Sequence, residues 1–267
     1  MTYFAVLLTL VVPPLVLLVA GRVIRLRQDH HHGTLRWQPL LIVLLHALLA
    51  LVYTMPWDNY LVASGVWWYD ETLVTGLSIG YIPIEEVIFF ILQTLLTGLW
   101  TLLLLDTLPY ALDGDVGGDG RPRHFVASAM IVTIWAASAA VVAAGWQPMR
   151  YAALILVWSL IPILIQITFG ADLLWRSRAV IALAVLPTTL YLWLVDALAI
   201  RSGTWTIDPA QTAGLALGPL PVEEMLFFFM TNLIVAYGIT LMLSPAARTR
   251  AASIANRLPR RQSTGEG

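Results

Sequence analysis

The chain has 267 residues, of which 59% are hydrophobic and only 12% are charged, and its formal net charge is −1. A soluble domain of this length needs more polar surface, so the composition predicts an integral membrane protein. The absence of cysteine excludes disulfides, thiolate metal sites and cysteine nucleophiles. The basic residues are all arginine and form no dense patch outside the loops and tail, so a nucleic-acid partner is not expected.

Seven apolar segments are long enough to cross a bilayer, whose core of about 30 Å needs roughly 20 helical residues. In chain order they are residues 3–21, 37–56, 83–105, 125–144, 151–169, 179–198 and 221–243. These runs are too long and too uniformly apolar for barrel strands, whereas a helix satisfies its own backbone polar groups in hydrocarbon. We therefore predict an all-α membrane protein of about seven transmembrane helices, surrounded by membrane lipid.

The arginines lie mostly on one side of such a seven-helix arrangement. All except Arg150 and Arg201 follow the first or seventh helix, or precede the fourth or sixth. Arginine is enriched in cytoplasmic loops. We therefore predict a multi-pass protein of the cell membrane with its N-terminus outside and its C-terminus in the cytoplasm.

Two parts of the sequence are copies of each other. A shift of 138 residues, from Asp58 to Asp196, aligns them without a gap through the start of their third helices. The other identical pairs are Gly65 and Gly203, Trp67 and Trp205, Asp70 and Asp208, Gly76 and Gly214, Gly80 and Gly218, Pro83 and Pro221, Glu85 and Glu223, Glu86 and Glu224, Phe89 and Phe227, and Phe90 and Phe228. So many rare residue types in one register indicate an internal duplication.

The duplication predicts how the chain is divided. We expect a first repeat at 1–110 with helices one to three, a linker and spacer helix at 111–150, a second repeat at 151–245 with helices five to seven, and a tail at 246–267. Because the fourth helix returns the chain to its starting side, the copies should be parallel. A pseudo-two-fold axis along the membrane normal would then bring the acidic residues of both copies to the same leaflet.

Each copy carries a Pro-x-Glu-Glu motif where its third helix begins: Pro83-Ile84-Glu85-Glu86 and Pro221-Val222-Glu223-Glu224. One interpretation is helix-start chemistry, because proline and acidic residues are both favoured there. However, capping needs one carboxylate and no aromatic partner, whereas both glutamates recur here. The phenylalanines that follow one turn later also recur, as Phe89, Phe90, Phe227 and Phe228. The repetition favours a functional site.

Carboxyl groups at membrane depth are usually functional. A glutamic acid kept protonated in apolar surroundings is a proton donor, and an ionised neighbour is a proton acceptor. The sequence therefore predicts a catalytic set of Glu85, Glu86, Glu223 and Glu224, with Asp58 and Asp196 as companions.

Aromatic and glycine residues precede these helices. Trp67, Trp68 and Trp205 belong either to an interfacial aromatic belt or to the wall of a substrate cavity, where ring faces would stabilise a cation. Four glycines recur before the motifs: Gly76, Gly80, Gly214 and Gly218. We interpret them as residues of tight turns rather than of a phosphate-binding loop, because no strand precedes them and the sequence has no Walker pattern.

Other polar residues receive structural interpretations. The run from His30 to His32 is expected to be solvated, and His46 to be packed and hydrogen-bonded. The stretch 113–120 is interpreted as an acidic linker, because His124 stands where a calcium loop has its last glutamate. Hydrogen bonds between helices are expected for Gln93, Thr231 and Asn232. No metal site is expected.

The succession of Asp, Gly-x-Trp, spaced glycines and Pro-Ile-Glu-Glu-Val-Ile-Phe-Phe, repeated as Pro-Val-Glu-Glu-Met-Leu-Phe-Phe, resembles the membrane-integral lycopene cyclase domain. That family occurs as two small subunits or as one fused chain, and this sequence is similar to the fused form. The resemblance implies cyclisation of the ends of a linear carotenoid, commonly lycopene to β-carotene, in which the Pro-x-Glu-Glu glutamates are essential and Pro83 and Pro221 position them.

The implied reaction is an isomerisation by protonation, ring closure through a carbocation and deprotonation, with no net redox change. No flavin or nicotinamide cofactor is expected, and contact with other carotenoid-pathway enzymes is possible. The alternative function is a proton- or cation-coupled transporter that uses the same carboxylates. A retinal protein is excluded because no lysine can form a Schiff base.

Overall fold

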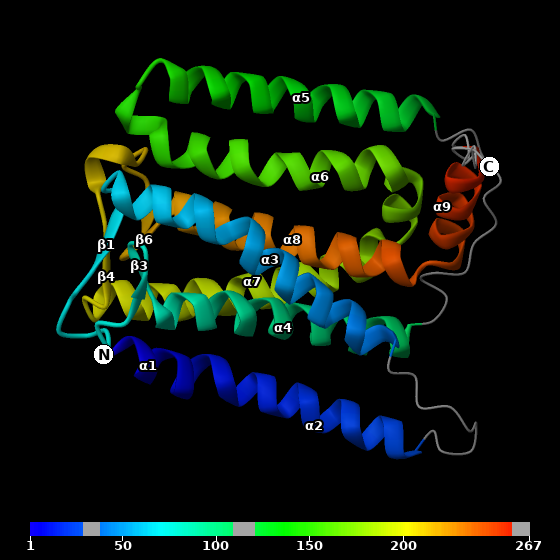
Figure 1. Cartoon of the computed structure of the whole chain (residues 1–267), viewed down its shortest axis with the longest axis horizontal. Helices are drawn as coiled ribbons and strands as arrows, with labels where there is room; N and C mark the ends of the chain where they lie inside the picture. The colour runs from blue at the N-terminus through cyan, green and yellow to red at the C-terminus, as the bar shows by residue number, and fades with distance from the viewer. Residues whose placement is uncertain (29–37, 109–120, 258–267) are drawn as a thin grey trace, which may run out of the picture.

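The computed structural model describes residues 1–28, 38–108 and 121–257, most of which form long helices that run side by side (Figure 1). Within these residues, seven helical segments are long and apolar enough to cross a membrane, which confirms the predicted fold class. They are Tyr3–Arg25, Gln38–Ala63, Ile84–Thr107, His124–Ala143, Gln147–Arg176, Arg178–Arg201 and Val222–Leu243.

The two copies share one order of long helices and short strands, and they differ in a π-helical turn in the first copy and a 3-10 helix in the second. The first comprises α1 (Tyr3–Val6), a π-helical turn η1 (Leu7–Val11), α2 (Val12–Gln28), α3 (Gln38–Ala63), β1 (Trp67–Tyr69), β2 (Ser78–Ile79), β3 (Ile82–Pro83) and α4 (Ile84–Thr107). The second comprises α6 (Arg150–Arg176), α7 (Arg178–Arg201), β4 (Trp205–Ile207), the short 3-10 helix η5 (Pro209–Gln211), β5 (Ala216–Leu217), β6 (Leu220–Pro221) and α8 (Val222–Leu243). Between them lie α5 (Arg121–Ala143) and the 3-10 helix η4 (Gln147–Met149), and α9 (Pro245–Arg257) follows.

The second helix of each copy is longer than the sequence predicted. α3 continues through Pro56 to Ala63, and α7 continues to Arg201. A proline inside a transmembrane helix is tolerated because neighbouring groups satisfy the freed backbone. As a result, Asp58 and Asp196 lie inside helices, each in the last two turns before the loop that follows.

Equivalent residues of the two copies meet in pairs. β1 and β4 form an antiparallel ladder in which Trp68 faces Thr206, its equivalent under the 138-residue shift. Tyr53 donates a hydrogen bond of 2.9 Å from α3 to the first helix of the second copy, and its equivalent Tyr191 donates one of 2.5 Å from α7 to the first helix of the first copy. These reciprocal contacts show that a pseudo-two-fold axis, which passes through the ladder, relates the two copies.

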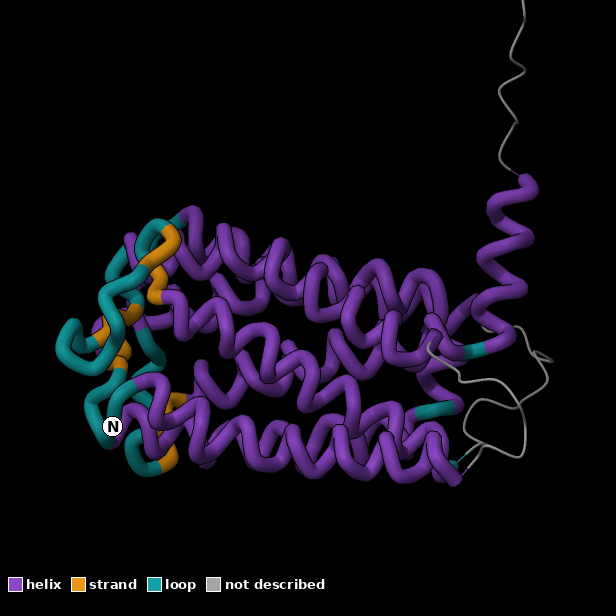
Figure 2. The backbone as a smooth tube through the Cα atoms, turned by 60° about the horizontal axis from the view of Figure 1, so that its bottom comes forward, coloured by secondary structure: helices purple, strands orange, loops and turns teal. Residues whose placement is uncertain are grey.

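α4 and α8 occupy the centre of the bundle, and more than half of the residues in the most apolar stretch of each helix are buried. α5 lies at the edge of the bundle against α6 (Figure 1), and only 6% of the residues in its most apolar stretch are buried. All of the short strands gather at the end of the bundle where the N-terminus lies (Figure 2). The helices therefore hold these strand-containing loops of both copies against one another at one end.

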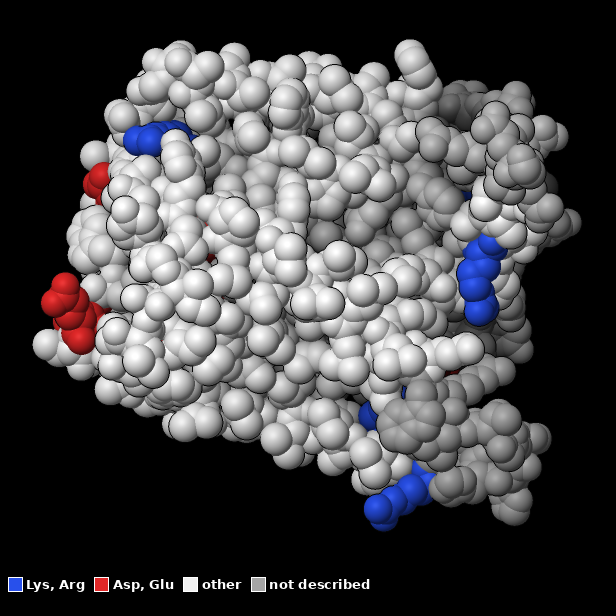
Figure 3. All heavy atoms as spheres, viewed as in Figure 1, with Lys and Arg blue, Asp and Glu red and all other residues white. Residues whose placement is uncertain are grey.

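Charged side chains gather at the two ends of the molecule, and the face between them is uncharged (Figure 3). The last helix, α9, lies at the end opposite the strands, although the sequence predicted only a tail there. Its Arg250 binds Asp172 of α6 through two hydrogen bonds of 2.8 and 2.7 Å, and His124 lies 3.1 Å from the same carboxyl group. This ion pair attaches α9 to the bundle.

Candidate active site

Backbone geometry places the glutamates in the first turn of a central helix in both copies. Pro83 and Pro221 are extended and immediately precede the first helical residues of α4 and α8. Before each proline the chain makes a tight hairpin, in which Gly80 and Gly218 have φ values of 68° and 64°. Gly76 also has a positive φ. Glycine adopts such values readily, so these turns position the motif.

The first glutamate of each motif is turned toward its own loop. An oxygen of Glu85 accepts a 2.7 Å hydrogen bond from the backbone N–H of Thr75, and Glu223 accepts the equivalent 2.7 Å bond from Ala213. Both side chains are buried, but neither lines the cavity described next. Glu85 and Glu223 therefore hold the loop that contains Gly76 or Gly214 against its helix.

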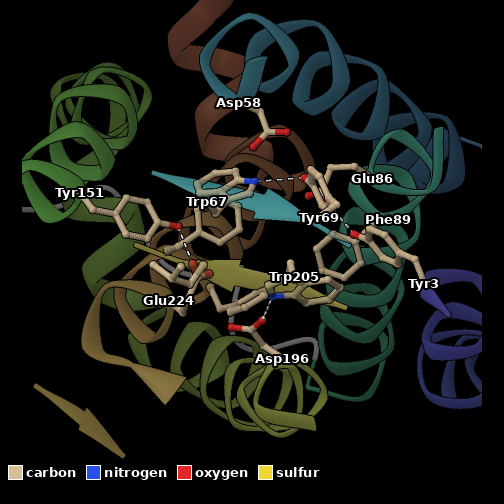
Figure 4. Close-up of a pocket in the computed structure, with 13 residues that line it drawn as sticks. Tyr3, Asp58, Trp67, Tyr69, Glu86, Phe89, Tyr151, Asp196, Trp205 and Glu224 are labelled. Carbon is tan, nitrogen blue, oxygen red and sulfur yellow. Dashed lines mark hydrogen bonds between the residues drawn. The ribbon is translucent and has the colours of Figure 1, made fainter. Parts of the chain in front are cut away.

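The second glutamate of each motif faces a cavity between the two copies (Figure 4). Glu86 accepts a hydrogen bond from the hydroxyl of Tyr3, and Glu224 accepts one of 2.6 Å from the hydroxyl of Tyr151. Each tyrosine is the first or second residue of the first helix in the copy whose glutamate it binds. The phenol donates to one carboxyl oxygen and fixes the direction of the carboxyl group.

One cavity of about 40 Å³ receives side chains from both copies. Its walls are four carboxyl groups, three phenols and six apolar or indole side chains: Asp58, Glu86, Asp196 and Glu224; Tyr3, Tyr69 and Tyr151; Trp67, Phe89, Trp205, Ile207, Phe227 and Phe228. Carboxyl groups that the sequence places in separate repeats thus belong to one site.

The two sides of the cavity differ in their hydrogen bonds. The indole of Trp205 donates a 2.9 Å bond to Asp196, whereas the equivalent Trp67 donates a 3.1 Å bond to the hydroxyl of Tyr69. Ile207 occupies the position equivalent to Tyr69 and has no polar side-chain atom. The first copy therefore holds its glutamate with an additional phenol.

Tyr69 lies on β1, outside the transmembrane segments, and its hydroxyl interacts with Glu86. Burial and the adjacent Glu86 carboxyl raise the pKa of the Tyr69 hydroxyl well above its usual range. This phenol therefore keeps its proton at neutral pH and is a hydrogen-bond donor.

The aromatic residues named from the sequence divide into three groups. Trp67, Trp205, Phe89, Phe227 and Phe228 line the carboxyl cavity. Phe90 does not line this cavity; it faces a second, larger one between α3 and α6. Trp68 is 48% exposed and projects from the opposite face of the β1–β4 ladder, because successive residues of a strand alternate in direction. The structure therefore contradicts a cavity position for Trp68.

Tyr3 and Tyr151 were not recognised in the sequence as site residues. They are 148 residues apart, whereas the motifs are 138 residues apart, so a single shift does not align them. The only signal is a tyrosine at the start of the first helix in both copies. The stretch from this tyrosine to the matched aspartate, Asp58 or Asp196, is ten residues longer in the first copy, which accounts for the change of register.

The polar residues interpreted as structural are bonded as expected where the structure describes them. His46 Nδ1 lies 2.7 Å from the carbonyl oxygen of Ile42 on its own helix. Thr97 donates to the Asn232 side chain, which donates to Thr189, so that α4, α8 and α7 are linked. The histidine run at 30–32 and the acidic stretch at 113–120 lie outside the described residues.

The fold and cavity define a multi-pass membrane protein with a single carboxyl-lined site shared by two internal copies. A family model described as lycopene cyclase matches residues 1–104 and 148–242, which contain nearly all of the first and second copies and leave out α5. The chain belongs to the lycopene cyclase family.

Curated relatives agree with this membership. The chain is 39% identical to a lycopene beta-cyclase of Halobacterium salinarum over 249 residues, which cover 93% of this chain and 99% of the relative. It is 35% identical over 197 residues to a bifunctional lycopene cyclase/phytoene synthase of Aspergillus niger, covering 72% of this chain and 33% of that protein. No solved structure matches the chain significantly.

Proposed function

We propose that this protein cyclises the ends of a linear carotenoid, with lycopene as substrate and a β-ring as product, in the cavity shared by its two copies. The observation that carries the proposal is the pair of glutamates, Glu86 and Glu224, each held by a phenol and each facing the same apolar, aromatic cavity. The name of the Halobacterium salinarum relative supports the same substrate class.

The reaction begins with proton transfer. A protonated carboxyl group gives its proton to the terminal double bond of the polyene, which breaks that π bond and leaves a tertiary carbocation. The nearby double bond attacks the cation and forms the carbon–carbon bond of the ring. A carboxylate then removes a proton from a neighbouring ring carbon, so atoms and electrons balance without any redox partner.

The cavity offers groups for each step. Glu86 and Glu224 provide an acid and a base within one site, and Asp58 and Asp196 supply further carboxyl oxygens. The faces of Trp67, Trp205 and Phe227 stabilise positive charge through their ring quadrupoles. Because the steps are proton transfers and a ring closure, we infer that neither flavin nor nicotinamide takes part.

The central test uses Glu86→Gln and Glu224→Gln in cells that accumulate lycopene. Glutamine retains an acceptor oxygen for the tyrosine but cannot transfer the proton, so each variant should lose about 10²–10⁴-fold in cyclisation rate. Membrane levels of the protein should stay unchanged. Full activity in both variants would contradict the proposal.

Two further measurements address the chemistry. Wild-type protein in deuterated water should place solvent deuterium in the new ring, because the initiating proton comes from an exchangeable carboxyl group. Purified protein in lipid should cyclise lycopene without added cofactor. A strict requirement for reduced flavin would contradict the acid-base mechanism.

We also propose that the strand-containing end faces outward and that α9 lies in the cytoplasm, with lipid around the uncharged belt. The arginines support this orientation: Arg25, Arg176 and Arg248 lie at the α9 end, whereas Arg150 and Arg201 lie at the strand end. A reporter after Arg257 should be cytoplasmic, and one inserted between Asp70 and Gly76 should be external. The reverse result would overturn the orientation.

A further inference from the structure

A groove separates α3 from α6 on the lipid-facing side of the bundle. Its cavity measures about 310 Å³ and has α4 and α8 as its floor. Leu49 of α3 and Ile161 and Ile165 of α6 line it and are 54%, 42% and 65% exposed, so the groove opens sideways. Figure 3 shows the surface hollowed in this region.

The groove leads toward the carboxyl cavity. Phe227 lines both, and it stacks with Trp57 at 5.8 Å between ring centroids. Trp57 in turn stacks with Trp158 at 4.6 Å. An aromatic wall therefore continues from the groove to the carboxyl groups, without a charged residue among the groove's lining.

The groove runs along α3. The groove extends along α3 from His46 to Tyr53, and the aromatic wall continues one turn further to Trp57. At a rise of 1.5 Å per residue, the stretch of α3 from His46 to Trp57 is roughly 16 Å long. Between Tyr53 and Trp57, two hydrogen bonds join α3 to α6: Tyr53 binds the carbonyl of Trp158, and Trp57 binds the carbonyl of Leu154. These bonds hold the two helices together at the end near the carboxyl cavity.

The aromatic wall is present in only one half of the molecule. The 138-residue shift aligns Trp57 with Val195. In the first helices, the 148-residue shift that aligns Tyr3 with Tyr151 also aligns Leu10 with Trp158. The bond from Tyr191 to Leu10 is nevertheless retained. The two-fold symmetry of the fold is therefore broken at this groove. A structural requirement common to both halves does not explain the stacked indoles.

We propose that this groove binds the polyene chain of the carotenoid, which enters sideways from the lipid between α3 and α6 and places its end in the carboxyl cavity past Phe227. This inference rests on the proposed function. Within lipid, water does not drive apolar association, so selectivity comes from close packing. A conjugated polyene is stiff and flat, and it stacks on the rings of Trp158 and Phe227.

The occupant favoured by these features is the polyene rather than an acyl chain. A flexible acyl chain loses conformational freedom when it is held straight, whereas a polyene is already extended. The groove also continues into the carboxyl cavity, where the end group of the carotenoid must react. A groove that only held a lipid would not need this connection.

The test blocks the groove at its exposed wall and uses the symmetry for its control. Ile165→Trp fills the opening of the groove. Leu17→Trp is the control: Leu17 is equivalent to Ile165 under the 148-residue shift of the first helices, and it is 73% exposed. Cyclisation of lycopene in membranes should fall at least tenfold for Ile165→Trp and should not change for Leu17→Trp. Leu49→Trp blocks the groove from α3 and serves if Ile165→Trp fails to insert.

Binding is measured separately in the Glu86→Gln/Glu224→Gln background, as lycopene retained per protein after purification in lipid. Adding Ile165→Trp or Leu49→Trp should reduce retention severalfold, and adding Leu17→Trp should not. Unchanged retention and cyclisation in both groove variants would overturn the groove assignment and leave the cyclase proposal standing. Groove-dependent retention without any cyclisation by the wild type would instead contradict the proposed function alone.

Discussion

Gln93 and Thr231 occupy equivalent positions in the two copies and are joined by a hydrogen bond of 2.7 Å, in which the Gln93 amide donates to the Thr231 hydroxyl. A bond between equivalent residues lies on the symmetry axis. Together with the Trp68–Thr206 pair, it shows that this axis passes through the strand ladder and between the two central helices.

This pair gives a prediction about stability. Thr231→Val removes the acceptor and leaves the Gln93 amide without its partner, whereas in Gln93→Leu the Thr231 hydroxyl still donates to the carbonyl of Phe227. An unpaired buried polar group costs more than a pair removed cleanly. Thr231→Val should therefore lower the melting temperature in detergent more than Gln93→Leu, with a cost of about 1–2 kcal/mol. Equal melting temperatures of the two variants would show that the unpaired Gln93 amide carries no extra cost.

The tyrosines give a prediction about activity. A hydrogen bond to a charged group is worth about 1.5–3 kcal/mol, so Tyr151→Phe should reduce the cyclisation rate by about 10- to 100-fold. Tyr3→Phe should reduce it less, because Glu86 also interacts with Tyr69. Initial rates in membranes, normalised to protein, measure both effects.

The double variant Tyr3→Phe/Tyr69→Phe is the corresponding control. It removes both phenols from Glu86 and should lose as much activity as Tyr151→Phe. If Tyr3→Phe alone already equals Tyr151→Phe, Tyr69 does not support Glu86.

The first glutamates should behave differently from the second. Glu85→Gln keeps an oxygen for the Thr75 N–H, and Glu223→Gln keeps one for Ala213, so both variants should retain folding and most activity. Glu85→Ala leaves that N–H unpaired and should lower stability by about 1–3 kcal/mol. Thermal unfolding and pigment analysis distinguish the two effects. Loss of activity in a fully folded Glu85→Gln would place this carboxyl in the chemistry.

The hairpin glycines offer a matched pair. An alanine at either position adopts a left-handed conformation, which costs about 1–2 kcal/mol. A Cβ at Gly80 would also lie 2.2 Å from the Asn59 side-chain oxygen, whereas one at Gly218 meets nothing within 4 Å. Gly80→Ala should therefore destabilise the protein more than Gly218→Ala in thermal unfolding. The opposite order would mean that Asn59 moves without cost.

The sequence predicted those features that depend on composition and repetition. Uniform apolar runs indicated the seven spans, and one fixed shift revealed the two copies. The different surroundings of Glu85 and Glu86 were not predictable, because adjacent residues of a motif look alike until the loop carrying Thr75 is placed beside one of them. The direction of Trp68 depended in the same way on the register of a strand pair.

Two other features depended on contacts outside the motif. Tyr3 and Tyr151 reach the glutamates only after the first helix of each copy packs against the third. α9 is held by the pairing of Arg250 with Asp172, which are far apart in sequence. Neither contact leaves a periodic signal in the chain.

The ladder between β1 and β4 has the form of an isologous contact, in which one surface patch meets a copy of itself. Two separate three-helix units of identical sequence would be able to make the same ladder and enclose the same ring of carboxyl groups as a homodimer. Joining such units end to end while both keep the same direction in the bilayer requires one additional crossing. α5, which packs at the edge against α6 and contributes no residue to the cavity, provides that crossing.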